Sequence, residues 1–120
     1  MKIAVSSNGR NLESQVDQRF GRAAYFIVYD LEHDSFQAVE NKQNLQAAQG
    51  AGIQSGRTVA DSGARAVLTG NVGPKAYQVL NAAGIKIYLV KGGTVKEAID
   101  AYRAGRLEPA SGANVDGHWV

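Results

Sequence analysis

The stretch AVLTGNVGPKAYQVLNAAGIKIYLV, residues 66–90, decides the fold class. Its two ends, 66–70 and 85–90, are short apolar runs of the kind that form buried strands. Between them, Pro74 begins a helix where its missing N–H does no harm, and Gly84 ends that helix. One face of the helix is apolar at the spacing of successive turns: Ala76, Val79, Leu80 and Ala83. A strand, a helix and a second strand in succession predict a parallel β-α-β unit.

Helices are also predicted on either side of this unit. After it, Thr94 and Glu97 have the spacing of a capping box, and Gly105 stops the helix that they begin. The apolar face of that helix consists of Val95, Ala98, Ile99 and Tyr102. Before the unit, residues 51–62 predict a helix closed by Gly63, although glycines within it weaken the pattern.

Three strands are predicted in the first third of the chain, at residues 2–6, 24–30 and 35–41. The second is apolar on both faces, which is typical of a strand covered on both sides. Residues 42–50 are polar and predict a mobile connection. The order β-β-β-α-β-α-β-α therefore predicts an α/β domain in which an antiparallel hairpin is followed by β-α units. We expect one domain, residues 1–106, and a C-terminal tail, 107–120, without clear periodicity.

Composition excludes several classes of protein. The 120 residues are 44% apolar and 20% charged, an ordinary globular balance. No apolar run has the roughly 18 residues of a transmembrane helix, and the N-terminus is too polar for a signal peptide. We therefore expect a cytoplasmic protein without a membrane partner. A net charge of +2 does not favour nucleic acid as a partner.

The chain contains no cysteine, which excludes disulfides, thiolate zinc sites and cysteine-bound iron–sulfur clusters. With only His33 and His118, the usual ligands of a transition-metal site are also lacking. We expect no metal ligand from the protein, so that any metal arrives inside a preformed complex. His33 is predicted to lie exposed in a turn. The tail is predicted to dock its one tryptophan, Trp119, on the body of the domain; the alternative is a flexible lid that carries His118 and Trp119.

Ligands of open α/β sheets favour the carboxyl ends of parallel strands. Three predicted turns leave such ends, and their candidate binding residues are Asn8 and Arg10; Gly70, Asn71 and Gly73; and Lys91 and Gly92. The last two turns lead into helix N-termini, where N–H groups and the helix dipole favour an anion. Tight turns alone explain each glycine singly. Three such turns together with nearby cations, including Lys75, predict an anion-binding face.

The segment Arg19-Phe20-Gly21-Arg22 enters the second strand from a loop. If that strand runs antiparallel to the first, both arginines lie beside the same crevice. Phe20 alone is more simply a core residue, and Gly21 permits a turn. For the arginine pair, ligand binding and plain solvation remain equal alternatives.

Catalysis has little support in the sequence. No Ser–His–Asp set and no phosphate-binding Gly-x-x-x-x-Gly-Lys-Ser/Thr loop is present, and the first predicted strand carries no carboxylate for a two-metal nuclease. We therefore expect a binding protein rather than an enzyme.

Several motifs, in order, resemble the dinitrogenase iron–molybdenum cofactor biosynthesis family. They are MKIAVSSNG (1–9), DQRFGRAAYF (17–26), GAG (50–52), TGNVGPKAYQVLNAAGIKIY (69–88) and GGTVKEAIDAY (92–102), and the resemblance spans about residues 1–105. It implies a ribonuclease-H-like α/β fold with a mixed five-stranded sheet and helices on both faces. It also implies a non-catalytic protein that binds, stores or hands on a preformed molybdenum-containing metal–sulfur cluster.

One position departs from the family pattern. Many members have histidine where this chain has Arg19, and arginine offers charge and hydrogen bonds but no metal ligation. With no cysteine either, the resemblance extends as well to the molybdenum–copper sulfide carriers of the orange-protein type as to carriers of the iron–molybdenum cofactor. The sequence thus predicts noncovalent binding of an anionic cluster. Arg19 and Arg22 would supply cations to it, the glycine turns, Gly21 included, would supply backbone donors, and Phe20 would supply apolar surface. An interaction module for a cluster-transfer or ATPase protein, and a binder of phosphate or nucleotide, are the alternatives; the oligomeric state is undecided.

Overall fold

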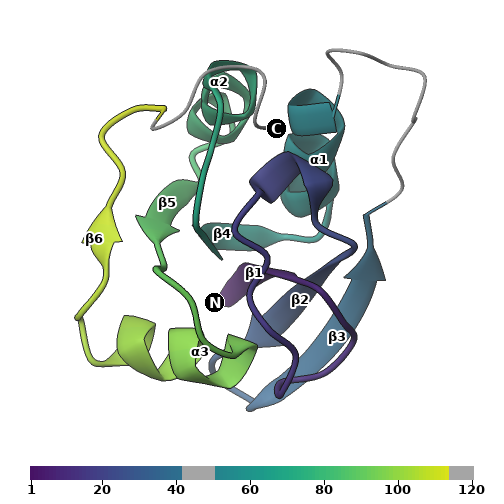
Figure 1. Ribbon diagram of the computed structural model, residues 1–120, viewed down its shortest axis with the longest axis vertical. Helices are drawn as coiled ribbons and strands as arrows, with labels where there is room; N and C mark the ends of the chain where they lie inside the picture. The colour runs from purple at the N-terminus through teal and green to yellow at the C-terminus, as the bar shows by residue number, and fades with distance from the viewer. Residues whose placement is uncertain (42–50, 114–120) are drawn as a thin grey trace.

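The computed structural model describes residues 1–41 and 51–113 as a six-stranded sheet with three α-helices and one 3-10 turn (Figure 1). The strands are β1 (Lys2–Ser7), β2 (Tyr25–Asp30), β3 (Ser35–Glu40), β4 (Ala64–Thr69), β5 (Lys86–Leu89) and β6 (Glu108–Pro109). The helices are α1 (Ala51–Asp61), α2 (Pro74–Ala82) and α3 (Val95–Arg103), and the 3-10 turn is η1 (Phe20–Arg22). The predicted order of elements is confirmed as far as α3.

Strand β1 lies inside the sheet and joins its two halves. It pairs antiparallel with β2, where Ser7 is opposite Tyr25, and parallel with β4. Strand β3 pairs antiparallel with β2, and β5 pairs parallel with β4, which gives the order β3-β2-β1-β4-β5-β6. The sheet is therefore mixed, as predicted, and the carboxyl end of β1 lies beside the start of β2.

Helices cover both faces of the sheet, also as predicted. Helices α1 and α2 pack on one face, over a core that includes Phe26 and Val28, and α3 packs on the other, over Ile27 and Tyr29 (Figure 1). The alternation along β2 explains why its sequence is apolar on both sides. The capping box of α3 is formed as predicted, since Thr94 and Glu97 bond reciprocally.

The predicted count of five strands is wrong, because β6 adds a sixth. Its two residues pair antiparallel with β5, and the backbone N–H of Ala110 donates to the carbonyl of Ile87 over 2.8 Å. A two-residue strand that contains Pro109 shows no alternation of apolar and polar residues, and it is ordered by the open edge of β5. The sheet therefore extends past residue 106 into the segment predicted to be a tail.

Some predictions concern segments that the structure does not describe. The connection 42–50 and the end of the tail, with His118 and Trp119, lie outside the described residues. In the described part of the chain, no helix is long and apolar enough to cross a membrane.

Candidate functional site

The predicted turns after β1 and β4 meet the arginine segment at one edge of the sheet. Arg19 forms a parallel bridge with Asn71, and the backbone N–H of Phe20 donates to the Asn71 carbonyl over 3.1 Å. We call residues 19–22 together with residues 70–71 the lip. The lip thus joins two segments that lie about fifty residues apart in the sequence, as the antiparallel pairing of β1 and β2 led us to expect.

The aromatic ring of the lip points into the protein. Phe20 is fully buried, and its ring lies 5.2 Å from that of Phe26, centroid to centroid, in a tilted arrangement. This confirms the interpretation of Phe20 as a core residue. The prediction that its ring offers apolar surface to a cluster is wrong, because the ring is fully buried. Phe20 fastens η1 to the sheet, while Arg19 is exposed and Arg22 is half-buried.

A buried polar network holds η1 from below. The hydroxyl of Ser55, on α1, lies 3.2 Å from the carbonyl of Gly21 and 3.1 Å from Oδ1 of Asn41. The Asn41 amide donates in turn to the carbonyl of Ala23 over 2.8 Å. Both Ser55 and Asn41 are buried, so the backbone of the turn is fixed from two directions. Sequence reasoning missed this pair, because a lone serine or asparagine carries no pattern.

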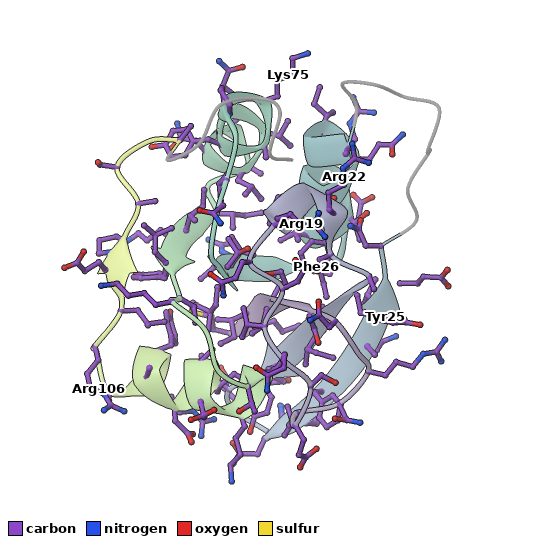
Figure 2. All side chains as sticks on the ribbon, in the orientation of Figure 1. Arg19, Arg22, Tyr25, Phe26, Lys75 and Arg106 are labelled. Carbon is purple, nitrogen blue, oxygen red and sulfur yellow. The ribbon has the colours of Figure 1, made fainter. Side chains whose placement is uncertain are left out.

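The two arginines leave the turn with little compensation of their charge (Figure 2). The side chain of Arg19 is 56% exposed, and its Nε lies 4.0 Å from Asp17 Oδ1, which also accepts the backbone N–H of Arg19 over 2.9 Å. Arg22 forms no ion pair with any residue in 1–41 or 51–113. A charge at the surface that is not matched by a partner remains available to an anion.

Beneath the lip, a small polar network ties the ends of β1 and β4 together. The hydroxyl oxygen of Ser6 lies 2.7 Å from that of Thr69 and 2.7 Å from the carbonyl of Asp17. Gly70 follows, and a Cβ at this position would lie 2.2 Å from the side-chain oxygen of Gln18 and 2.9 Å from its Cα. Only glycine fits there, so Gly70 is required by the close approach of Gln18, which sequence analysis did not single out.

Arg10 lies at the same end of the sheet but is engaged by an aromatic ring. Its guanidinium carbon is 5.0 Å from the ring centroid of Tyr25, and its Nε donates to the Tyr25 hydroxyl over 3.1 Å. The hydrogen bond to Tyr25 is the main reason that the pKa of Arg10 is raised. Asn8 is exposed in the same turn, where its N–H donates to the carbonyl of Gln15. These two predicted residues flank the lip.

The turn after β4 also leads to α2. Gly73 is buried at the N-cap of α2, and Pro74 occupies the first helical position as predicted. Lys75 is exposed at the start of the helix (Figure 2).

Lys91 and Gly92 belong to a different part of the surface. They line a cavity of about 660 Å³ whose wall also includes Arg106. Arg106 lies far across the view from Arg19 and Arg22 in Figure 2. The two groups are separated because the loop after β1 crosses between them: the N–H of Val16 donates to the carbonyl of Gly93 over 2.9 Å.

The N-terminus of α3 has no free N–H groups for an anion, so that part of the prediction is wrong. The N–H groups of Val95 and Lys96 donate to carbonyls of the crossing loop, at Ser14 and Leu12, each over 2.9 Å. The next N–H, of Glu97, donates to the Thr94 hydroxyl. A polar loop without periodicity gave no sign that it would pair with this helix.

Metal ligands do not gather anywhere in the described ranges. Within residues 1–41 and 51–113, no group of three or more His, Cys, Asp or Glu side chains could hold a metal ion. His33 is exposed in the turn after β2, as predicted, and bonds to Asp30 at the end of the sheet away from the lip.

Comparison with known proteins shows the family of this chain. The family model described as dinitrogenase iron-molybdenum cofactor matches residues 1–105. The chain belongs to this family. The match includes the whole lip and both parallel β-α units, so the resemblance recognised in the sequence is confirmed.

Several known proteins are similar to this member of the dinitrogenase iron–molybdenum cofactor family over nearly its full length. The apo form of the orange protein from Desulfovibrio gigas is 42% identical, with a TM-score of 0.89 over 95% of this chain and 96% of that chain. A putative NifB protein from Thermotoga, solved by NMR, is 37% identical, with a TM-score of 0.81 over 97% and 98%. An uncharacterised protein of Methanocaldococcus jannaschii is 30% identical over 110 residues, 90% of each chain.

Proposed function

We propose that this protein is a carrier of a preformed, anionic, molybdenum-containing metal–sulfur cluster, which it binds noncovalently at the lip. The observation that supports this most is the placement of Arg19 and Arg22 on one fixed turn, at the carboxyl ends of β1 and β4. Within the described residues, the 4.0 Å contact between Arg19 and Asp17 is the one ion pair that either arginine makes. Membership of a family named for the iron–molybdenum cofactor supports molybdenum as the metal of the cargo.

The chemistry of the lip fits a large, soft anion. Guanidinium groups are weakly hydrated and planar, so they give up little solvation when they face an anion that is itself weakly hydrated. Arg19 cannot ligate a metal, and no cysteine is available to do so. The cluster would keep its own sulfur shell, of the molybdenum–copper sulfide or the iron–molybdenum type, and the protein would supply charge and hydrogen bonds.

The proposed carrier has no catalytic role. Asp17, the carboxylate that contacts Arg19, already accepts the backbone N–H of Arg19, and the nearby hydroxyls of Ser6 and Thr69 are buried and bonded to each other. These groups stabilise the turn rather than being placed to move a proton at the surface. Binding and release of the cargo are therefore the proposed activity.

The proposal is tested by elemental analysis and a visible spectrum of the protein purified without denaturant or high salt. In parallel, purified apoprotein is titrated with tetrathiomolybdate, with and without copper. Replacing both lip arginines, Arg19→Ala with Arg22→Ala, should weaken binding by about 100-fold, since each charge-assisted contact contributes roughly one tenfold step. The matched control is Arg65→Ala with Arg106→Ala, which removes two exposed arginines outside the lip.

Each result has a definite reading. If the lip variant keeps its metal content and spectrum, the proposed site is wrong, and loss of binding in the control would move the site to the cavity beside Lys91. A wild-type protein that refuses every metalate but co-purifies with a fixed partner would favour an interaction module. Competition by nucleotide during the titration would favour a phosphate binder, since helix N-termini do not distinguish sulfide anions from phosphates.

A further inference from the structure

One buried polar group at the lip has no partner in the apoprotein. In residues 1–41 and 51–113, the amide nitrogen of Gln18 is the single buried side-chain nitrogen or oxygen that makes no hydrogen bond. Native proteins rarely leave such a donor unsatisfied, because burial removes its water without replacing it. The position of this unsatisfied donor in the fold suggests why it has no partner within the chain.

Gln18 stands directly beneath the lip. It precedes Arg19 in the chain, and its side chain lies so close to the backbone of Gly70 that a Cβ there would meet the Gln18 oxygen at 2.2 Å. Both neighbouring segments are fixed, because Arg19 bridges to Asn71 and the N–H of Asp17 donates to the carbonyl of Ser6 over 2.9 Å. The side chain is thus held in place between the ends of β1 and β4 without a partner for its nitrogen.

Nearby acceptors are already engaged by other donors. The carbonyl of Asp17 accepts from the Ser6 hydroxyl, Asp17 Oδ1 accepts from the N–H of Arg19, and the Asn71 carbonyl accepts from the N–H of Phe20. Each of these acceptors, on Asp17 beside Gln18 or on Asn71 bridged to Arg19, therefore already has a donor from within the chain. An acceptor that arrives from outside the chain would complete the set.

We propose that the side-chain amide of Gln18 is a binding group for the cargo and donates a hydrogen bond to a sulfur or oxygen atom of the anion held at the lip. This inference rests on the proposed function and extends it, because it adds a neutral, directional donor to the two arginines. The terminal torsion of a glutamine side chain is soft, so the amide turns toward an arriving acceptor without movement of the backbone. The anion then contacts the charges of Arg19 and Arg22 and the directional donor of Gln18, so that the site sets the orientation of the anion as well as its affinity.

The test compares the affinity of the purified full-length chain for tetrathiomolybdate with the stability of the same chain. Gln18→Leu keeps the size of the side chain and removes the donor, and it should weaken binding by about tenfold. Its midpoint of thermal unfolding should stay equal to that of the wild type or rise, because no hydrogen bond of the apoprotein is lost. The control Gln37→Leu, at an exposed glutamine on the outer strand β3, should change binding little.

A purely structural role for Gln18 gives the opposite result, with lower stability and unchanged affinity, and would overturn the inference. The inference would also be overturned if Gln18→Leu bound tetrathiomolybdate as tightly as the wild type while the double lip variant lost binding. The proposed function would then stand without the role of Gln18. If the wild type does not bind tetrathiomolybdate, or the double lip variant binds it as well as the wild type does, the proposed function and this inference both fail.

A second measurement applies to the unaltered chain, in case Gln18→Leu does not fold. Side-chain amide resonances of the wild-type protein are followed by NMR while tetrathiomolybdate is added. The Gln18 resonances should shift in step with binding, and those of Gln37 should stay in place. A titration in which binding occurs and the Gln18 resonances do not move would overturn the inference.

Discussion

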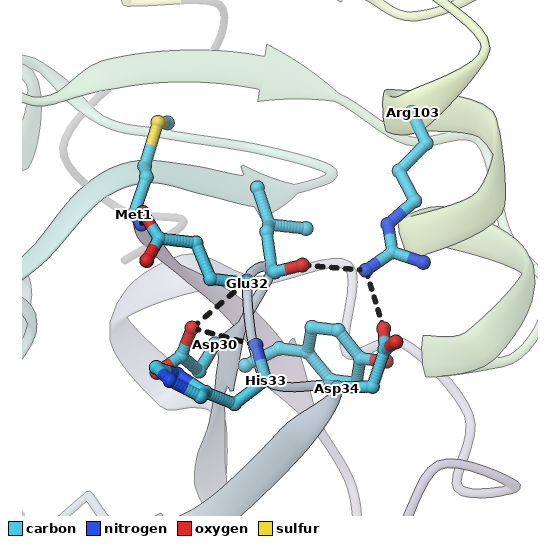
Figure 3. A network of polar contacts seen from close by, with 8 residues as sticks. Met1, Asp30, Glu32, His33, Asp34 and Arg103 are labelled. Atoms are coloured by element: carbon cyan, nitrogen blue, oxygen red, sulfur yellow. Dashed lines mark hydrogen bonds and ion pairs between the residues drawn. The ribbon is translucent and has the colours of Figure 1, made fainter.

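The turn between β2 and β3 and the lip lie at opposite ends of strand β2. They differ in whether their charged side chains have ion-pair partners. In the turn, each charged group has a partner (Figure 3): the N-terminal ammonium with Glu32 at 3.2 Å, His33 with Asp30 at 2.9 Å, and Arg103 with Asp34 at 2.6 Å. At the lip, Arg19 has one distant contact with Asp17, and Arg22 has no ion pair within the described ranges.

The paired charges of the turn have a structural task. Arg103, on α3, donates both to the Leu31 carbonyl and to Asp34. It therefore fastens the β2–β3 turn to a helix about seventy residues later in the sequence. The same contacts hold the pKa of the Asp34 carboxyl below its usual range, with Arg103 as the larger cause and the Tyr29 hydroxyl as the next. Pairing of this kind neutralises the charged groups of the turn and orders it.

The two regions differ in whether the contacts that order the backbone also neutralise charged side chains. The lip is as well fixed as the turn, but its hydrogen bonds run through backbone carbonyls and buried neutral groups such as Ser55 and Asn41. The hydrogen bonds that fix the lip therefore leave the positive charges of Arg19 and Arg22 largely unneutralised. Three variants break or sharpen this contrast.

The largest effect on stability is expected from Gly70→Ala. The added methyl group would meet the Cα of Gln18 at 2.9 Å, and backbone atoms cannot give way as the end of a flexible side chain can. Overpacking of this kind costs about 1–3 kcal/mol, which denaturant unfolding would measure. Gly112→Ala is the matched control, because a Cβ there meets nothing within 4 Å. Equal stability of the two variants would mean that the lip is less tightly fixed than we describe.

The next effect is expected from Ser55→Ala, which removes the buried hydroxyl beneath η1. It leaves Asn41 Oδ1 and the Gly21 carbonyl without that donor, at a cost of about 1–2 kcal/mol in the free energy of unfolding. Binding of tetrathiomolybdate should weaken as well, because the turn that carries both arginines loses its support. Thr58→Val removes a hydroxyl of the same helix that bonds only within α1, and it should leave binding unchanged. If the two variants bind alike, η1 is held by other contacts.

The smallest effect concerns the turn and appears only in acid. The hydrogen bond from His33, followed by that from the backbone N–H of Glu32, lowers the pKa of Asp30 from 3.8 to about 2. A depressed carboxyl pKa stabilises the folded state above the unfolded value, and that contribution is lost as the pH falls from about 4 toward 2. Asp30→Asn should therefore flatten the fall in stability over this range.

Thermal unfolding at a series of acidic pH values measures this slope. His33→Gln should change it in the same direction as Asp30→Asn, because His33 is the largest cause of the shift. Tetrathiomolybdate binding near neutral pH should be the same in both variants and in the wild type, since the turn lies away from the lip. An unaltered slope in both variants would show that the His33–Asp30 contact does not persist in solution.

Much of the fold follows from local patterns in the sequence. The glycine and proline signals at Gly63, Pro74 and Gly84 marked helix boundaries correctly, and the all-apolar second strand revealed a sheet covered on both faces. These features depend on residues close together in the chain. The antiparallel start of β2 beside the end of β1 was likewise enough to bring the arginines to the predicted edge.

What the sequence did not reveal depends on contacts between distant segments. Strand β6 exists because β5 offers an open edge, and the loop that satisfies the N-terminus of α3 comes from eighty residues earlier in the chain. For the candidate site, the arginines and Gly70 were found by their residue type and position. Gln18, Ser55 and Asn41 were not, because single polar residues gain meaning only from their neighbours in space.

The central position of β1 has a consequence for the order of events in the cell. The first strand made is paired with β4, some sixty residues later, so the sheet closes through contacts of large sequence separation, which is a slow route of folding. Because Asn71 completes the lip, the lip cannot form until more than half of the chain has been synthesised. Under the proposed function, an unfinished polypeptide would therefore have no completed site for a metal cluster.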